Sequence, residues 1–109
     1  MRVSKLEAAK TQIETSIRLY FSDGDTVSTH TLTGAANQIL RDIGKHRGID
    51  SMKESFLKMT KPEKVKEMKA LLNSTQSFFK HADNDPEGTI DFNPEETYIY
   101  LFDCCLIVV

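Results

Sequence analysis

The sequence lacks tryptophan, contains only two cysteines and carries little net charge. Cys104 and Cys105 are adjacent, and neighbouring cysteines are poorly placed to bridge each other because a disulfide needs a specific geometry. No third cysteine exists to pair with either, so the sequence favours a reducing, cytoplasmic location. The net charge of −2 provides no general attraction to nucleic acid or to an anionic membrane, and we expect neither as a partner.

Long apolar runs and catalytic loops are also missing. No stretch approaches the length of a membrane span, and the first residues contain no apolar run of the kind that a secretory signal needs. Glycine-rich phosphate loops and the Gly-x-Ser-x-Gly nucleophile motif are absent. The two cysteines lie in an apolar segment, where burial raises the pKa of a thiol and makes it unreactive. The sequence therefore contains no complete catalytic signature.

What is present is the composition of an ordinary globular domain, with 39% apolar and 28% charged residues. We expect residues 1–109 to form one domain, since the chain is long enough for a single hydrophobic core. Basic residues dominate from Arg41 to Lys69 and acidic residues from Asp83 to Glu96. This asymmetry could orient a partner, but solvated helix faces are the simpler explanation, and we favour it.

Helical spacing of apolar residues runs through most of the chain. A capping box, Ser4 with Glu7, predicts a first helix to about Phe21, and a second begins near Ser28 and ends at Gly44 or Gly48. A short third helix covers about residues 50–59. A second capping box, residues 60–63, opens a fourth helix, and Asn93 with Pro94 opens a final segment over residues 97–109. The pattern predicts an all-α, up-down helical bundle of four main helices and one short helix.

The final segment is strongly apolar and ends in Leu106, Ile107, Val108 and Val109. Its start favours a helix, whereas its β-branched end would also suit a strand. Because an apolar end must be covered by its own bundle or by another subunit, we expect a homodimer through this segment. An unidentified protein partner remains the other possibility.

The densest gathering of polar chemistry is the acidic turn, which we define as residues 81–91 and which contains His81, Asp83, Asp85, Glu87 and Asp91. The carboxylates resemble an EF-hand calcium loop, with Gly88 at its sixth position and Ile90 at its eighth. Pro94 occupies the twelfth position and cannot supply the bidentate ligand. Asp83, Asp85, Glu87 and Asp91 are therefore candidate ligands of a divalent cation; the alternative is a turn whose aspartates cap backbone amides.

Two histidines add further hypotheses. The stretch from Gln76 to His81 resembles the Arg-x4-His motif of HEPN (higher eukaryotes and prokaryotes nucleotide-binding) domains, which are small helical bundles, often dimers and often ribonucleases. That resemblance implies a catalytic His81 with Lys80 beside it, but Gln76 replaces the arginine that would stabilise phosphate charge. His30, in the first turn of the second helix, is either a polar packing residue or part of a His30–His81–Asp83 site.

A broader resemblance covers most of the chain. Residues 6–19, 30–42 and 78–83 resemble a family of uncharacterised bacterial helical proteins found among mobile-element genes, including integron gene cassettes. The resemblance implies a bacterial, cytoplasmic protein and no particular activity. Members often continue past the final apolar segment, which implies that the end at Val109 is shortened or reworked.

These observations predict a non-enzymatic cytoplasmic binding or interaction protein of a mobile-element or defence-associated family. The predicted ligand-binding residues are His30, His81, Asp83 and Asp85. No resident cofactor is expected apart from the candidate divalent cation. The alternative is an enzyme centred on His81, either a degenerate HEPN-like ribonuclease or a metal-dependent hydrolase.

Overall fold

The computed structural model describes residues 1–108 and shows an all-α fold, which confirms the predicted class. The helices are α1 (Lys5–Phe21), α2 (Thr26–His46), α3 (Met52–Lys58), the 3-10 helix η1 (Pro62–Lys64), α4 (Val65–Phe78) and α5 (Glu96–Val108). The four longer helices and the short α3 are those that the apolar spacing predicts. Val109 lies outside the described residues. No described helix combines the length and the apolar character that crossing a bilayer requires.

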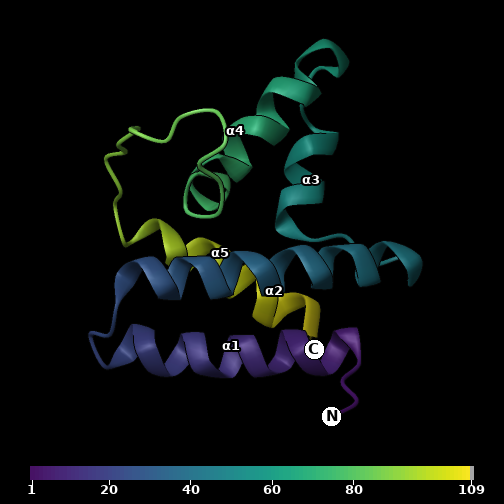
Figure 1. The fold of residues 1–109 in the computed structure, drawn as a ribbon. Helices are drawn as coiled ribbons and strands as arrows, with labels where there is room; N and C mark the ends of the chain where they lie inside the picture. Colours follow the sequence, from purple (N-terminus) through teal and green to yellow (C-terminus); the bar gives the residue numbers. More distant parts are fainter. Residues whose placement is uncertain (109) are drawn as a thin grey trace.

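Helices α1 and α2 lie antiparallel and side by side, joined by a tight turn (Figure 1). The predicted capping box opens α1: the Ser4 hydroxyl accepts from the Glu7 amide, and the Glu7 carboxylate accepts from the Ser4 amide. Helix α2 begins two residues earlier than predicted, at Thr26, because the Asp25 carboxylate accepts from the Val27 amide and caps it. The up-down arrangement is thus confirmed for this pair.

Helix α5 packs against both members of the pair and completes the core. The core side chains come from α1, α2 and α5: Ala9, Ile13, Ala36, Leu40, Leu101, Cys104 and Ile107. The Cys104 thiol is buried among them, and this burial raises its pKa to about 12, as the apolar surroundings predict. The β-branched end of the segment is helical through Val108, so the strand alternative is wrong for those residues.

Helices α3 and α4 form an arm that rises from the far side of α2 (Figure 1). The chain can leave α2 sharply because Gly48 adopts a φ of 72°, a left-handed conformation that suits glycine. The Ser51 hydroxyl then caps α3 by accepting from the Glu54 amide.

Two predicted start signals need correction. The Thr60 capping box is wrong: the Thr60 hydroxyl donates to the Phe56 carbonyl, and η1 starts after Lys61 without a side-chain cap. The last carbonyls of α3 lack helical partners, and the Thr60 hydroxyl donates to one of them instead of capping the next helix. Asn93 does accept from the Glu95 amide, but the intervening residues form a turn and α5 begins only at Glu96.

Candidate functional site

The acidic turn lies outside regular secondary structure, and its His81 and four carboxylates are exposed. Its chain follows the outside of the molecule between α4 and α5 (Figure 1). His81, Asp83 and Asp85 line one shallow hollow of about 550 Å³, together with Ser74, Ser77, Phe78 and Asn84. The structure therefore brings three of the predicted ligand-binding residues together, whereas Glu87 and Asp91 lie outside that hollow.

The side chains of the turn have few fixed partners. Within residues 1–108, the His81 side chain forms neither a hydrogen bond nor an ion pair; its backbone amide donates to the Ser77 carbonyl. Over the same residues, no group of three or more His, Cys, Asp and Glu side chains is arranged to hold a metal ion. The calcium-loop hypothesis gains no support from this arrangement and stays a prediction, as does a catalytic role for His81 with Lys80.

His30 lies elsewhere, in the interior, and does not line the His81 hollow. Its Nδ1 is 2.8 Å from the Thr97 hydroxyl oxygen, and its Nε2 is 3.9 Å from a Glu96 carboxylate oxygen. The rings of Phe79, Phe92 and Tyr100 surround the His30 imidazole in edge-to-face contacts. Burial lowers the pKa of His30, which favours the neutral ring at neutral pH. This geometry is that of a polar packing residue that ties α2 to α5.

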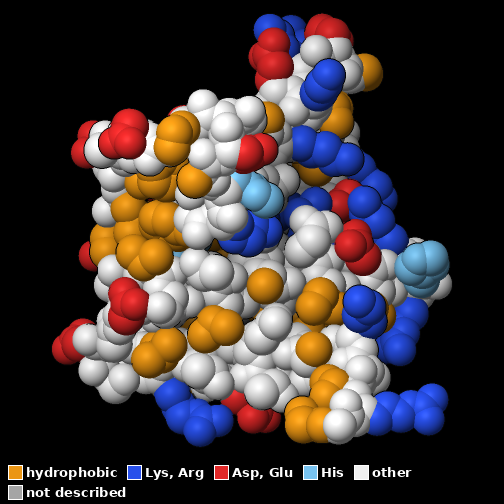
Figure 2. Space-filling view, viewed as in Figure 1, with side chains coloured by type: hydrophobic (Ala, Val, Ile, Leu, Met, Phe, Trp, Pro, Cys, Tyr) orange, Lys and Arg blue, Asp and Glu red, His pale blue; other side chains and the backbone are white. Residues whose placement is uncertain are grey.

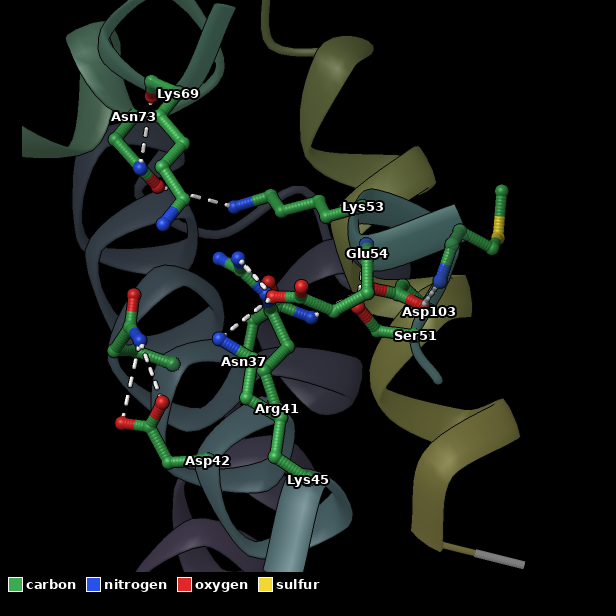
Figure 3. Close-up of polar contacts among 12 residues, drawn as sticks. Asn37, Arg41, Asp42, Lys45, Ser51, Lys53, Glu54, Lys69, Asn73 and Asp103 are labelled. Carbon is green, nitrogen blue, oxygen red and sulfur yellow. Dashed lines mark hydrogen bonds and ion pairs between the residues drawn. The ribbon is translucent and has the colours of Figure 1, made fainter. Parts of the chain in front are cut away.

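A second gathering of polar groups lies at the junction of α2, α3 and α5 (Figure 3). We call Asn37, Arg41, Lys53, Glu54 and Asp103 the central cluster. Asp103 is only 1% exposed. One of its carboxylate oxygens accepts from the Asn37 amide at 2.9 Å, and the other accepts from the Met52 backbone amide at 2.7 Å. A single carboxylate thus holds α2 and the start of α3 against α5.

An ion pair joins α2 to α3 beside it. The Arg41 guanidinium donates to Glu54 Oε1 at 2.8 Å, and the Lys45 ammonium lies 3.3 Å from the same oxygen (Figure 3). Burial raises the pKa of Glu54, but the hydrogen bonds from Arg41 and Lys45 outweigh it, so the pKa falls below its ordinary value. Glu54 is therefore a charged carboxylate at neutral pH that neutralises part of the cationic surface of α2.

Lys53 is the unusual member of the cluster. It is 7% exposed, yet no carboxylate oxygen of the described residues lies within 4.0 Å of its ammonium. The ammonium donates to Asn73 Oδ1 at 3.3 Å and lies 4.3 Å from the centre of the Tyr100 ring, where it makes a cation–π contact. Burial, followed by the nearby Arg41 charge, lowers the pKa of Lys53 to about 8.

A cavity of about 320 Å³ opens beside Lys53, between α3, α4 and α5. We call it the arm cavity; it is lined by Met52, Lys53, Phe56, Leu72, Glu96, Ile99, Tyr100 and Asp103. Most of these side chains are apolar or aromatic, and Lys53 supplies the cation. An apolar cavity with one perturbed charged group has the character of a ligand-binding pocket.

The sequence reasoning missed the central cluster. Its members are dispersed along the chain, with Asn37 and Asp103 separated by 66 positions. One signal could have pointed to it: Asp103 is the only charged residue between Thr97 and Val109. A lone carboxylate in an apolar helix is buried together with its neighbours and then requires hydrogen-bond donors.

Comparisons of this chain with protein-family models, with curated proteins and with solved structures find no match. The resemblances to HEPN domains and to mobile-element proteins therefore stay predictions from the sequence. Any function has to be argued from the surfaces and cavities of the molecule itself.

Proposed function

We propose that this protein is a non-enzymatic interaction protein that works as a homodimer, with the outer side of α5 as its contact surface. The supporting observation is the exposure of four large apolar side chains along that side, which we call the α5 outer face: Tyr98, Ile99, Phe102 and Leu106. Between 48% and 55% of each is exposed. A helix that is apolar on all sides is normally covered on all sides, whereas α1 to α4 leave these four side chains of α5 about half exposed.

A second copy of the chain is the occupant that this face fits best. From Thr97 to Ile107 the only charged residue is Asp103, and it is buried, so two such faces meet without repulsion between like charges. The rings of Tyr98 and Phe102 are nearly parallel, 12° apart, which places two neighbouring aromatic side chains on the face. An uncharged and apolar face can meet the same face of a second copy across a two-fold axis.

The sequence resemblance supports the cellular setting of the proposal: a bacterial, cytoplasmic accessory of a mobile element or defence system. The exposed His81, Asp83 and Asp85 would serve as a separate polar surface for a further partner. In Figure 2, Lys and Arg side chains gather on the right of the view, toward the end of α2 and along α3, and that charge would orient such a partner.

The test is the mass of the protein in solution, measured by light scattering during gel filtration and by sedimentation equilibrium. We expect a dimer at tens of micromolar. Leu106→Glu should raise the dissociation constant of the dimer at least about 100-fold, because each of two symmetric contacts loses a buried side chain and gains a buried charge. Leu71→Glu is the matched control, since Leu71 is an exposed leucine on α4, away from that face.

Two results would contradict the proposal. The first is a wild-type chain that runs as a monomer at tens of micromolar. The second is a Leu106→Glu variant that associates as tightly as Leu71→Glu. Circular dichroism of both variants establishes that each is folded before its mass is interpreted.

A further inference from the structure

The Lys53 ammonium has fewer hydrogen-bond and ion-pair partners than a buried lysine normally has. A lysine ammonium has three N–H donors, and buried lysines are nearly always paired with an anion. Lys53 directs one donor to Asn73 at 3.3 Å, a long hydrogen bond, and none to a carboxylate within 4.0 Å. Two of its donors are therefore left for another acceptor.

The carboxylates nearest to Lys53 are engaged by other groups. Two buried cations, Arg41 and Lys53, and the half-exposed Lys45 lie in this part of the molecule with the carboxylates of Glu54, Asp103 and Glu96. Glu54 is occupied by Arg41 and Lys45, and both oxygens of Asp103 already accept from neutral amides. Lys53 is therefore a buried cation that no carboxylate contacts directly, in a part of the protein where a charge without a close partner is costly.

The arm cavity lies where that charge is. Lys53 and Tyr100 both line it, and the ammonium sits over the Tyr100 ring, so the charge lies at the cavity wall. The side chains of Met52, Phe56, Leu72 and Ile99 supply an apolar lining. A volume of about 320 Å³ is at the small end of the range for ligand pockets.

We propose that the arm cavity binds a small apolar carboxylic acid, with its carboxylate on the Lys53 ammonium and its hydrocarbon body against Phe56 and Ile99. The carboxylate supplies the missing anion and accepts the free donors of Lys53 in charge-assisted hydrogen bonds. The hydrocarbon body covers apolar surface that the chain leaves open. The arm cavity shares Ile99 with the proposed dimer contact, and its other lining residues lie outside the α5 outer face.

The two acidic residues of the lining are compatible with an anionic ligand. Asp103 is engaged through both oxygens by Asn37 and by the Met52 amide. The Glu96 side chain is 37% exposed and lies beside His30, so solvent screens its charge. A ligand with an amine in place of the carboxylate would set a second cation against Lys53 and Arg41, and it is therefore rejected.

The experiment uses hexanoate as the probe, with hexanol and hexylamine as its neutral and cationic analogues. Each is titrated into the full chain at pH 7 and followed by backbone amide shifts and calorimetry. We expect hexanoate to bind at least about tenfold more tightly than hexanol, as a charge-assisted contact requires, and hexylamine not to bind. The largest shifts should fall on α3 and on the first two turns of α5.

Variants locate the effect. Lys53→Met should reduce hexanoate affinity about tenfold, to the level of hexanol, whereas Lys66→Met, a change of an exposed lysine on α4, should leave it unchanged. Phe56→Ala keeps the charge and removes apolar lining from a half-exposed position, so it tests the site even if Lys53→Met fails to fold. We expect it to weaken binding about fivefold.

Three outcomes would overturn the proposal: no hexanoate binding at millimolar concentration, hexanol binding as tightly as hexanoate, or equal binding to wild type, Lys53→Met and Phe56→Ala. Repeating the titration in Leu106→Glu separates this site from the dimer contact, because Leu106 does not line the cavity. Binding retained in that variant supports a site within one chain, and binding lost there rules such a site out.

Discussion

The acidic turn and the central cluster contain similar side chains in opposite settings. The turn collects a histidine and four carboxylates within residues 81–91, and all five are exposed. The central cluster collects its charges from three helices, and Asn37, Arg41, Lys53 and Asp103 are all buried. Side chains that are close in sequence are here the ones with the fewest partners, while side chains far apart in sequence hold the helices together.

The difference arises because water solvates and screens exposed charges but not buried ones. An exposed carboxylate is solvated and screened, so its removal changes the stability little. A buried carboxylate has exchanged water for protein donors, and its removal leaves those donors with no partner. Three substitutions test this difference between the buried cluster and the exposed turn.

The largest effect is expected for Asp103→Ala. The change leaves the buried Asn37 amide and the part-buried Met52 backbone amide without their acceptor, so we expect the free energy of unfolding to fall by about 2–5 kcal/mol. The measurement is urea denaturation followed by circular dichroism. Asp83→Ala is the matched control in the turn, and we expect it to change the stability by less than about 0.5 kcal/mol.

Equal losses in the free energy of unfolding for Asp103→Ala and Asp83→Ala would contradict the difference between the buried cluster and the exposed turn. So would a loss below about 1 kcal/mol for Asp103→Ala, because it would mean that the stranded amides find other partners at little cost.

An intermediate effect, dependent on pH, is expected for Lys53→Met. Burial, with the nearby Arg41, lowers the pKa of Lys53 from 10.5 to about 8. Between these two values the unfolded chain binds more protons, so the folded wild type gains stability as the pH rises from 8 to 10.5. Below pH 8 the full penalty of burying the charge is present, and it amounts to at most about 3 kcal/mol. Methionine bears no such penalty.

The stability of Lys53→Met minus that of wild type should therefore be greatest at pH 7 and should shrink above pH 8. Urea denaturation at a series of pH values measures this difference. Burial raises the pKa values of the buried Cys104 and the half-buried Tyr100, so both side chains stay neutral from pH 7 to pH 9, where the difference is measured. Lys66→Met serves as the control and should show no such trend. A stability difference between Lys53→Met and wild type that does not change with pH would mean that burial does not destabilise the Lys53 ammonium.

The smallest effect is expected in the turn itself. We expect His81→Ala to change the free energy of unfolding by less than about 0.5 kcal/mol, because the side chain is exposed and forms no hydrogen bond or ion pair within residues 1–108. Thermal unfolding of metal-stripped protein, with calcium, zinc, manganese or magnesium added, tests the ion-binding hypothesis in the same sample. We expect no rise in melting temperature. A rise with one ion that disappears in His81→Ala would restore the turn as a binding site.

Much of the fold could be predicted from local chemistry. The Ser4 capping box, the apolar spacing of α1 and α2 and the apolar run of α5 each specify a helix through contacts between residues a few positions apart. Prediction failed at Thr60, where two helix ends compete for one hydroxyl, and the sequence does not say which end lies closer.

The candidate site was predictable only in part. The grouping of His81, Asp83 and Asp85 around one hollow followed from their positions in a single turn. The arm cavity and the environment of Lys53 did not, because they depend on how α3 and α4 lie against α5. A lysine in a short amphipathic helix is usually a solvated residue, and nothing in its neighbours marks Lys53 as buried.

The sequence by itself determined the helical class, the approximate helix positions and the apolar character of α5, because each depends on periodicity or composition over short distances. The tertiary structure decided that His30 packs inside, that Asp103 receives hydrogen bonds from residues 51 and 66 positions away, and that Lys53 is left without an anion beside an apolar cavity. Those features come from helix packing, in which the partner of a buried charge is chosen by geometry and not by distance along the chain.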